Sequence, residues 1–349
     1  MRALFALCCL TACGRTALFQ EPDPTCGPGF TPGAVATLQS TAALTPGTTT
    51  LLARSAVEVL PDDTAQFYDW KGARLANAIT LPARVQTSAS GDTAAIAWRD
   101  AKWHVARLSP AGLEPLGDFD GEAGAATVLD VGTAVQAAIS GERLVVHVVG
   151  GKSVELGTGN IVAATSDGEQ AWWVWATRSG PTWLTRLSRT GERVTEDVRL
   201  DDAGLEYGSF AAAFCGDGIA LARAQRLSTS PLRSRLTLTR VRLDGTRTEL
   251  GALAPEDRYA WMPALWCDET RVAAAWVENT EGAAGGLVSS TRLRFDDGSG
   301  AGAITLDETP ERAAYFPRLV LDGATLVTLW TTFGADGYAT QLMKLPCTR

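Results

Sequence analysis

The chain has 349 residues, and its 39 acidic side chains outnumber its 31 lysines and arginines, which gives a formal net charge of −8 at pH 7. Nucleic acids and anionic membrane surfaces carry charge of the same sign. This balance therefore argues against both of them as binding partners.

The N-terminal residues MRALFALCCLTACGR have the order of features of an export signal. Arg2 precedes the apolar run Ala3 to Leu10, which is far shorter than the ~18 residues that a membrane span needs. Leu10-Thr11-Ala12-Cys13 resembles the lipobox of bacterial lipoproteins, in which the cysteine becomes the lipidated N-terminus. The resemblance implies a signal peptide over residues 1–12 and a lipid on Cys13. A plain secretory signal that is cut elsewhere is the alternative.

The same resemblance implies a place in the cell envelope. In Gram-negative lipoproteins an Asp after the lipidated cysteine favours retention in the inner membrane, and Gly14 stands in that position here. We therefore expect the outer membrane. No later apolar run is long enough to span a bilayer, so acyl chains alone would anchor the chain. We expect a linker over residues 13–31 and one domain over residues 32–349.

The cysteines predict disulfide bonds. Cys8 and Cys9 leave with the signal peptide, and Cys13 carries the lipid, so four cysteines remain in an oxidising compartment. They allow three pairings. Zinc sites built from four cysteines need closely spaced pairs, whereas these are scattered, so we expect no metal site. The four are Cys26, Cys215, Cys267 and Cys347.

A unit made of a turn, alternating apolar residues and a final tryptophan recurs along the chain. Period-2 alternation between turns rich in Gly and Asp predicts strands joined in hairpins. One further copy has Arg223 in the tryptophan position, and SGERLVVHV, which ends at Val148, is a weak copy. The four clear copies end at Trp98, Trp175, Trp276 and Trp330.

A second repeated element, which contains an Arg-Leu pair or a similar pair, recurs downstream of four of these units and closes on Gly112, Gly191, Gly245 and Gly298. The later closing glycines, Gly191, Gly245 and Gly298, lie 54 and 53 residues apart. Units of ~40–50 residues with about four short strands resemble the blades of a β-propeller. One blade cannot bury both of its faces, so neighbouring blades must stack around an axis.

The resemblance is to the propellers of bacterial exported proteins, and it extends from Pro32 to Cys347. It implies an all-β fold of four-stranded antiparallel blades. Seven blades fit the repeats best, with a stunted, degenerate third blade around Val135 to Gly159; six and eight are the alternatives. Within a blade we expect an inner strand, a second strand that ends at the tryptophan, a third with the Arg-Leu pair, and an outer strand.

The last unit, Phe316 to Cys347, ends after its third strand. We expect GFTPGAVATLQS, near the mature N-terminus, to supply the missing outer strand and close the ring, because an open ring would expose apolar sheet faces. Cys26 and Cys347 flank this seam and are predicted to pair. Cys215 and Cys267 end neighbouring inner strands and form the complementary pair, provided that their Cα atoms lie within ~7 Å.

No catalytic motif is present. The sequence has no G-x-S-x-G elbow, no His-Glu-x-x-His zinc motif and no glycine-rich phosphate loop, and we expect no cofactor. His104 and His147 lie within predicted strands, and spacing identifies no Asp or Cys partner, which favours packing over catalysis. The tryptophans are more typical of wedges between blades than of ligand contacts.

The best candidate for ligand contact is one face of the ring. Loops between second and third strands, and connections from each outer strand to the next inner strand, share that face. An arginine group and rim tyrosines would suit a polar or anionic ligand or a protein loop. The alternative is that the arginines pair with local carboxylates and the tyrosines cap blade edges. The residues are Arg223, Arg226, Arg233, Arg235, Tyr207, Tyr259 and Tyr315.

These features together predict a lipid-anchored monomer that acts as a binding or scaffolding module for a protein or a polar ligand. The alternative function is a propeller hydrolase or lyase that acts on glycans, which needs two or more carboxylates over the axial channel. Six acidic residues lie near connections on the predicted rim. They are Asp118, Asp120, Asp201, Asp202, Asp307 and Glu308.

Overall fold

The structure is a computed structural model, and the residues that it describes are almost entirely strands and turns. They contain no helix long and apolar enough to cross a membrane. The described residues are 33–37, 48–52, 54–60, 62–82, 85–90, 92–122, 124–177, 180–201, 209–229, 231–281, 287–296, 303–308, 313–334 and 337–347. The predicted signal peptide and linker, with Cys13 and Cys26, lie outside these ranges.

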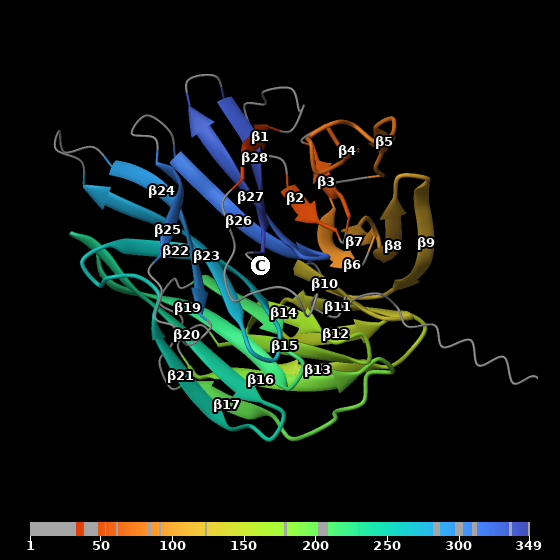
Figure 1. Cartoon of the computed structure of the whole chain (residues 1–349). Helices are drawn as coiled ribbons and strands as arrows, with labels where there is room; N and C mark the ends of the chain where they lie inside the picture. The colour runs from red at the N-terminus through yellow and green to blue at the C-terminus, as the bar shows by residue number, and fades with distance from the viewer. Residues whose placement is uncertain are drawn as a thin grey trace, which may run out of the picture.

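Seven four-stranded antiparallel sheets form a ring around one axis (Figure 1). Blade 1 contains β2 (Thr48–Leu51), β3 (Ala56–Val59), β4 (Thr64–Tyr68) and β5 (Ile79–Thr80). Blade 2 contains β6 (Gln86–Ser90), β7 (Thr93–Arg99), β8 (Trp103–Ser109) and β9 (Gly112–Phe119). Blade 3 contains β10 (Ala125–Val131), β11 (Ala134–Ser140), β12 (Leu144–Val148) and β13 (Ser153–Gly157).

The second half of the ring follows the same order. Blade 4 contains β14 (Asn160–Ser166), β15 (Gln170–Ala176), β16 (Thr182–Ser188) and β17 (Val198–Asp201). Blade 5 contains β18 (Ser209–Phe214), β19 (Gly218–Thr229), β20 (Leu232–Arg242) and β21 (Arg247–Ala252). Blade 6 contains β22 (Tyr259–Cys267), β23 (Val272–Glu281), β24 (Leu287–Asp296) and β25 (Ile304–Glu308). Blade 7 contains β26 (Ala313–Asp322), β27 (Thr325–Gly334), β28 (Gly337–Pro346) and β1 (Val35–Thr37).

This architecture confirms the predicted all-β, seven-bladed propeller with four-stranded antiparallel blades. The first strand of each blade lies towards the centre of the ring, and outer strands such as β9, β17 and β21 lie at its rim (Figure 1). The third blade is complete, with all four strands. It is not stunted: its strands have seven, seven, five and five residues, whereas those of blade 1 have four, four, five and two.

The ring closes as predicted, because the N-terminal segment supplies the outer strand of the last blade. β1, from the N-terminal end of the described chain, pairs antiparallel with β28, and Val35 lies opposite Met343. The Gly33 amide donates a hydrogen bond to the Lys344 carbonyl at 3.0 Å, which extends the ladder by one step. Blade 7 therefore combines three strands from the end of the described chain with one from its beginning.

The apolar core lies between blades. The described buried residues divide into seven clusters, and each cluster joins one pair of neighbouring blades. β23 shows how: Ala274 and Trp276 pack in the cluster shared with blade 5, while Ala273, Ala275 and Val277 pack in the cluster shared with blade 7. Successive strand residues point to opposite faces, so an alternating strand of small and large apolar residues serves both neighbours.

The repeated tryptophans hold equivalent positions on the second strands β7, β15, β23 and β27, and each packs in the cluster shared with the preceding blade. Trp175, Trp276 and Trp330 are buried, whereas Trp98 is partly exposed. The weak copy SGERLVVHV was assigned to the wrong strand: Leu144–Val148 is the third strand of its blade, and the second is β11, which carries no tryptophan.

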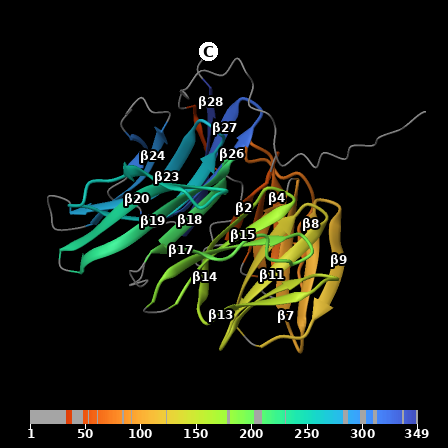
Figure 2. The ribbon, with the colours of Figure 1, turned by 90° about the horizontal axis from the view of Figure 1, so that it is seen from below.

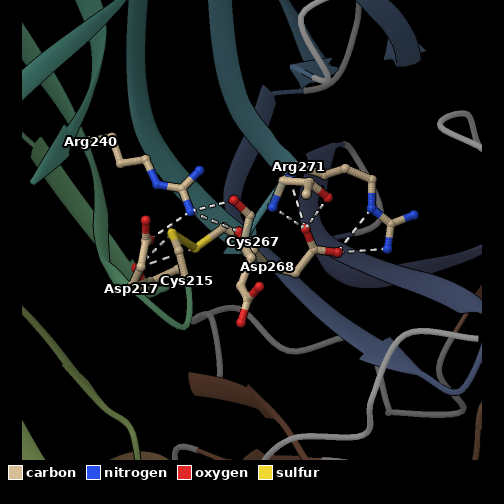
Figure 3. The surroundings of a disulfide bond; sticks show 9 residues. Cys215, Asp217, Arg240, Cys267, Asp268 and Arg271 are labelled. Atoms are coloured by element: carbon tan, nitrogen blue, oxygen red, sulfur yellow. Dashed lines mark hydrogen bonds and ion pairs between the residues drawn. A yellow bond between two sulfur atoms is a disulfide. The ribbon is translucent and has the colours of Figure 1, made fainter. Parts of the chain in front are cut away.

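The disulfide between Cys215 and Cys267 is present and joins the inner strands of blades 5 and 6 (Figure 3). The two Cα atoms lie 5.0 Å apart, within the range that a disulfide needs. Cys347 is also disulfide-bonded. Its predicted partner Cys26 lies outside the described residues, so that pairing stays a prediction.

Arginines on third strands tie neighbouring blades together. Arg240 on β20 donates to the Asp217 carboxylate at 2.7 Å and to the Glu269 carbonyl of blade 6, also at 2.7 Å (Figure 3). Arg107 on β8 likewise reaches blade 3, where it pairs with Asp130 at 3.0 Å. The repeated Arg-Leu element therefore supplies both an apolar core residue and an arginine that forms hydrogen bonds or an ion pair with the next blade.

Candidate functional site

The most distinctive surface of the ring is formed by three long hairpins on the predicted loop face. β7 and β15 end one residue after their tryptophans, at Arg99 and Ala176. β23 continues to Glu281, β27 to Gly334 and β19 to Thr229. The added length lies beyond the tryptophan position, so all of it projects from the face that carries the second-to-third connections.

These hairpins occupy neighbouring blades and make the face asymmetric. β19, β20 and β23 stand on one side of the ring, opposite the short strands β7 and β8 (Figures 1 and 2). We call the set of hairpins β19–β20, β23–β24 and β27–β28 the hairpin wall. AQRLSTSPLRSR, predicted as a loop, is mostly paired strand: β19 runs to Thr229 and β20 starts at Leu232.

The predicted arginines all belong to the β19–β20 hairpin but do not lie on one face of it. Ala224 and Leu236 pack towards blade 6, so Arg223, one residue before Ala224, lies on the opposite face. Burial lowers the pKa of the Arg223 guanidinium. Arg226 lies opposite Ser234, whose hydroxyl group donates to the Ala260 carbonyl of blade 6 at 2.6 Å.

The other two arginines lie nearer the tip of the hairpin. Arg235 is exposed and donates to the Glu256 carboxylate at 2.6 Å, and this hydrogen bond raises the pKa of the guanidinium. Arg233 is exposed beside the tip. Arg235 therefore has the local carboxylate partner that the alternative interpretation requires, while Arg233 extends towards solvent.

Two of the three predicted tyrosines are brought together by a tryptophan that the sequence analysis did not single out. The Trp261 ring lies 5.7 Å from the Tyr259 ring and 6.0 Å from the Tyr315 ring, in an edge-on contact with the latter. The three rings come from the inner strands of blades 6 and 7. Tyr207 lies outside the described residues.

The inner strands of blades 6 and 7 each contain a β-bulge next to one of these rings. The β22–β23 ladder shifts register between Trp261 and Ala264, and the β26–β27 ladder shifts between Tyr315 and Arg318. Each bulge contains a proline, in Trp-Met-Pro and Tyr-Phe-Pro respectively. Proline has no amide proton for a ladder and is tolerated at such bulges. The shared aromatic-x-Pro sequence is the signal that could have identified this pair.

A buried carboxylate network supports the wall at blade 6. The Glu278 side chain is 3% exposed and pairs with Arg258 and, at 3.3 Å, with Arg292. The indole nitrogen of Trp276 also donates to Glu278, at 3.5 Å. Two cations around one carboxylate satisfy its buried charge, so we assign this cluster a structural role.

The described members of the six acidic residues considered for glycan chemistry lie on or next to outer strands. Asp118, Asp201 and the pair Asp307–Glu308 belong to the outer strands β9, β17 and β25, in three different blades. Asp120 follows β9 and is exposed, while Asp202 lies outside the described residues. The described positions therefore lie at the rim of the ring, in three different blades.

Charged residues are rare on the inner strands. Asp130 pairs with Arg107, and Asp322 accepts a hydrogen bond from the Trp70 indole at 2.8 Å. Arg318 donates to the Pro317 carbonyl at 2.9 Å, and burial lowers the pKa of its guanidinium. Among the inner strands as described, β10 bears one charged residue and β26 bears two of opposite sign, so no inner strand carries the pair of carboxylates that glycoside hydrolysis requires.

Sequence spacing identified no acidic partner for His104, and the structure shows two. Its Nδ1 atom lies 2.7 Å from Asp118 and its Nε2 atom lies 3.0 Å from Asp100, and these contacts raise the pKa of the imidazole. His147 matches the packing interpretation better. It stacks on Phe119 with ring centroids 4.2 Å apart, and burial lowers its pKa.

No group of three or more His, Cys, Asp and Glu side chains that could hold a metal ion occurs among the described residues. The arrangement on the loop face offers exposed arginines, aromatic rings in contact with one another, and long hairpin edges. These groups bind by contact area and hydrogen bonds rather than by bond-making chemistry.

Comparison with known proteins finds the fold and no sequence family. No family model matches the chain, and no curated protein matches its sequence. The β-propeller domain of Cps50 (Swd1) from Myceliophteria thermophila is similar with a TM-score of 0.56 and 11% identity, over 88% of this chain and 99% of that one.

Two further solved structures give similar values. A chain from the S. cerevisiae assembly in which a Dbp5 variant is bound to Nup159, a Gle1 variant, IP6 and ADP has a TM-score of 0.52 and 10% identity, over 91% of this chain and 95% of that one. The WD40 propeller domain of Doa1 has a TM-score of 0.51 and 11% identity, over 90% of this chain and 97% of that one. At these identities the likeness concerns the fold alone.

Proposed function

We propose that the protein is a binding module that captures a partner protein on the hairpin wall. The observation that carries this proposal is the asymmetric extension of β19–β20, β23–β24 and β27–β28 on one face, while blades 2 to 4 keep short hairpins. A propeller needs no such extension to bury its core, because the inter-blade clusters already include the tryptophan positions.

The side chains on the wall suit a protein surface. Leu227 and Phe333 are 43% and 40% exposed, and the Phe333 ring contacts the Tyr338 ring across the β27–β28 hairpin in a tilted arrangement, with ring centroids 4.5 Å apart. Arg233 adds an exposed cation at the neighbouring hairpin. Exposed aromatic and arginine side chains are enriched at protein interfaces and dominate their binding energy. Structural neighbours include a chain from a multi-protein assembly, which is in keeping with a protein partner.

The test is comparative capture from envelope extracts. We expect the wild-type protein to retain one or a few defined partners, and the triple variant Leu227→Glu, Arg233→Glu and Phe333→Ser to lose them. The matched control is Leu75→Glu with Lys102→Glu, which changes exposed residues of blades 1 and 2 away from the wall. Unchanged melting temperatures for both variants would show that folding is intact.

Two outcomes would contradict the proposal. Undiminished capture of the same partner by the folded wall variant would show that the wall is not the binding surface. Equal loss in the control variant would place binding elsewhere on the ring. We name no enzymatic activity, because the described candidate carboxylates lie on the rims of different blades.

The proposal includes a lipid anchor, on the strength of the sequence Leu10-Thr11-Ala12-Cys13 alone. A lipidated Cys13 would hold the propeller at a membrane surface, with the outer membrane expected from Gly14. Metabolic labelling with a fatty-acid analogue should mark the wild-type protein and not Cys13→Ala. Labelling of the variant, or none of the wild type, would remove the anchor from the proposal without affecting the hairpin wall.

A further inference from the structure

A hollow of about 460 Å³ lies at the seam between blades 1 and 2, outside the hairpin wall. The connection after β5 forms one side, and β8 and β9 form the other. Most of the lining is apolar, with Trp98 and His104 at one end. The apolar residues are Leu81, Pro82, Val105, Leu113 and Pro115.

His104 is held rigidly at this end of the hollow. Its ring stacks on the Trp98 indole with centroids 5.2 Å apart and 20° between the ring planes. Asp118 holds one ring nitrogen at 2.7 Å and Asp100 holds the other at 3.0 Å. Because both ring nitrogens are hydrogen-bonded and one face of the ring is covered, the imidazole is held in a single orientation. The Trp98 side chain is held in place by its contact with this ring.

The charge of this arrangement is negative in either protonation state of His104. Two carboxylates give −2, and a protonated imidazole brings the sum only to −1. Asp118 lines the hollow, and its side chain is 49% exposed. Oδ1 is the oxygen that binds His104, and Oδ2 has no hydrogen-bond partner among the described residues. A carboxylate oxygen therefore remains available next to an apolar surface and an indole ring.

We propose that this hollow binds an alkylammonium group, that is, a compact cation carried on an apolar body. The apolar lining contacts the carbon atoms of the ligand, and Asp118 and the Trp98 ring contact the charge. Aromatic rings attract such cations through their negative faces, and a nearby carboxylate adds direct attraction. The volume suits a small ligand or one long side chain.

Two sources share this chemistry: a free organic amine and a lysine side chain of a bound protein. The inference does not rest on the hairpin wall, because the two surfaces lie in different blades. Free choline represents the first source, and N-acetyl-lysine-methylamide represents the second. Their neutral counterparts are 3,3-dimethylbutanol, which has the shape of choline, and the ε-acetylated lysine compound.

The protein contains only two histidines, so imidazole NMR signals report on the site and carry an internal control. We expect choline or the lysine compound to shift the His104 signal in a saturable manner and to leave the His147 signal in place. Binding by choline alone indicates a free amine, and binding by the lysine compound alone indicates a protein side chain. The neutral counterparts should bind about tenfold more weakly, since they lack the charge.

Variants test the residues named. Asp118→Asn should weaken binding of the cation about tenfold, and Trp98→Leu should do the same. Asp120→Asn, which removes an exposed carboxylate outside the hollow, is the matched control and should bind as the wild type does. An unchanged His147 signal verifies the fold of each variant. The proposal is overturned if neither cation shifts His104, if neutral counterparts bind equally well, or if Asp118→Asn has no effect.

Discussion

The two histidines differ in their surroundings, and they should give stability of opposite pH dependence. Carboxylates at both ring nitrogens raise the pKa of His104 above its ordinary value of 6.5, while burial beside Phe119 lowers the pKa of His147. The stability that His104 contributes is fully present below pH 6.5 and is lost as the pH rises through its raised pKa. The stability that His147 contributes is present above pH 6.5 and is lost as the pH falls through its lowered pKa.

Single substitutions separate these contributions. We expect His104→Asn to be destabilised relative to the wild type most strongly at about pH 5.5 and least at about pH 8.5. His147→Asn should show the opposite trend, with its largest relative cost at the higher pH. Denaturant unfolding at the two pH values measures both. A constant difference between His104→Asn and the wild type would show that the contacts with Asp100 and Asp118 do not favour the protonated ring.

At the scale of single elements, the third-strand arginine is the part of the repeat whose role only the structure reveals. Arg107 donates to the Asp130 carboxylate of the next blade at 3.0 Å and to the Gly132 carbonyl at 3.1 Å. The Asp130 side chain is 2% exposed. Removing one partner of such a pair leaves a buried charge without compensation, which costs more than the pair contributes.

Arg107→Met should therefore lower the free energy of unfolding by about 3 kcal/mol. The matched control is Arg143→Met, which breaks an exposed pair with Glu155 and should cost less than about 1 kcal/mol. Urea unfolding of the two variants measures the difference. Equal costs would mean that the tie between blades 2 and 3 adds nothing beyond a surface ion pair, and a double variant that also carries Asp130→Asn should recover part of the loss.

Some features of the strands could be predicted from the sequence, and others could not. The units that contain Trp276 and Trp330 predict second strands correctly because alternation is a local feature, but the prediction that these strands end at the tryptophan is wrong, since β23 continues to Glu281 and β27 to Gly334. The full length of β19 was not predicted, because AQRLSTSPLRSR contains turn-forming residues. Its extended conformation is stabilised partly by the hydrogen bonds between Ser234 and Ala260 of the next blade. The contact of His104 with Asp118 depends on the β8–β9 register, and a bulge after Val105 shifts that register. Composition carries neither kind of information.

At the scale of the whole molecule, stability comes from closing the ring. Each of the seven core clusters lies between two blades, so the two blades at the last seam each keep one apolar face uncovered until that seam forms. The seam at blade 7 depends on the three residues of β1, which cover the edge of β28. That edge would otherwise present unpaired backbone groups for pairing with another chain.

We expect a variant that begins at residue 38, and so lacks β1, to melt at a lower temperature than a variant that begins at residue 33, and to self-associate. Both variants lack the N-terminal cysteines and carry Cys347→Ser, so the loss of the disulfide bond at Cys347 is the same in both and the comparison isolates β1. Thermal unfolding followed by light scattering measures both effects. A synthetic peptide that spans residues 29–40 should raise the melting temperature of the shortened variant in proportion to its occupancy of the vacant edge. The peptide should have no effect on the variant that keeps β1. If the shortened variant stays monomeric and as stable as its control, closure by β1 contributes little, and the packing of blade 7 against blades 1 and 6 holds the ring.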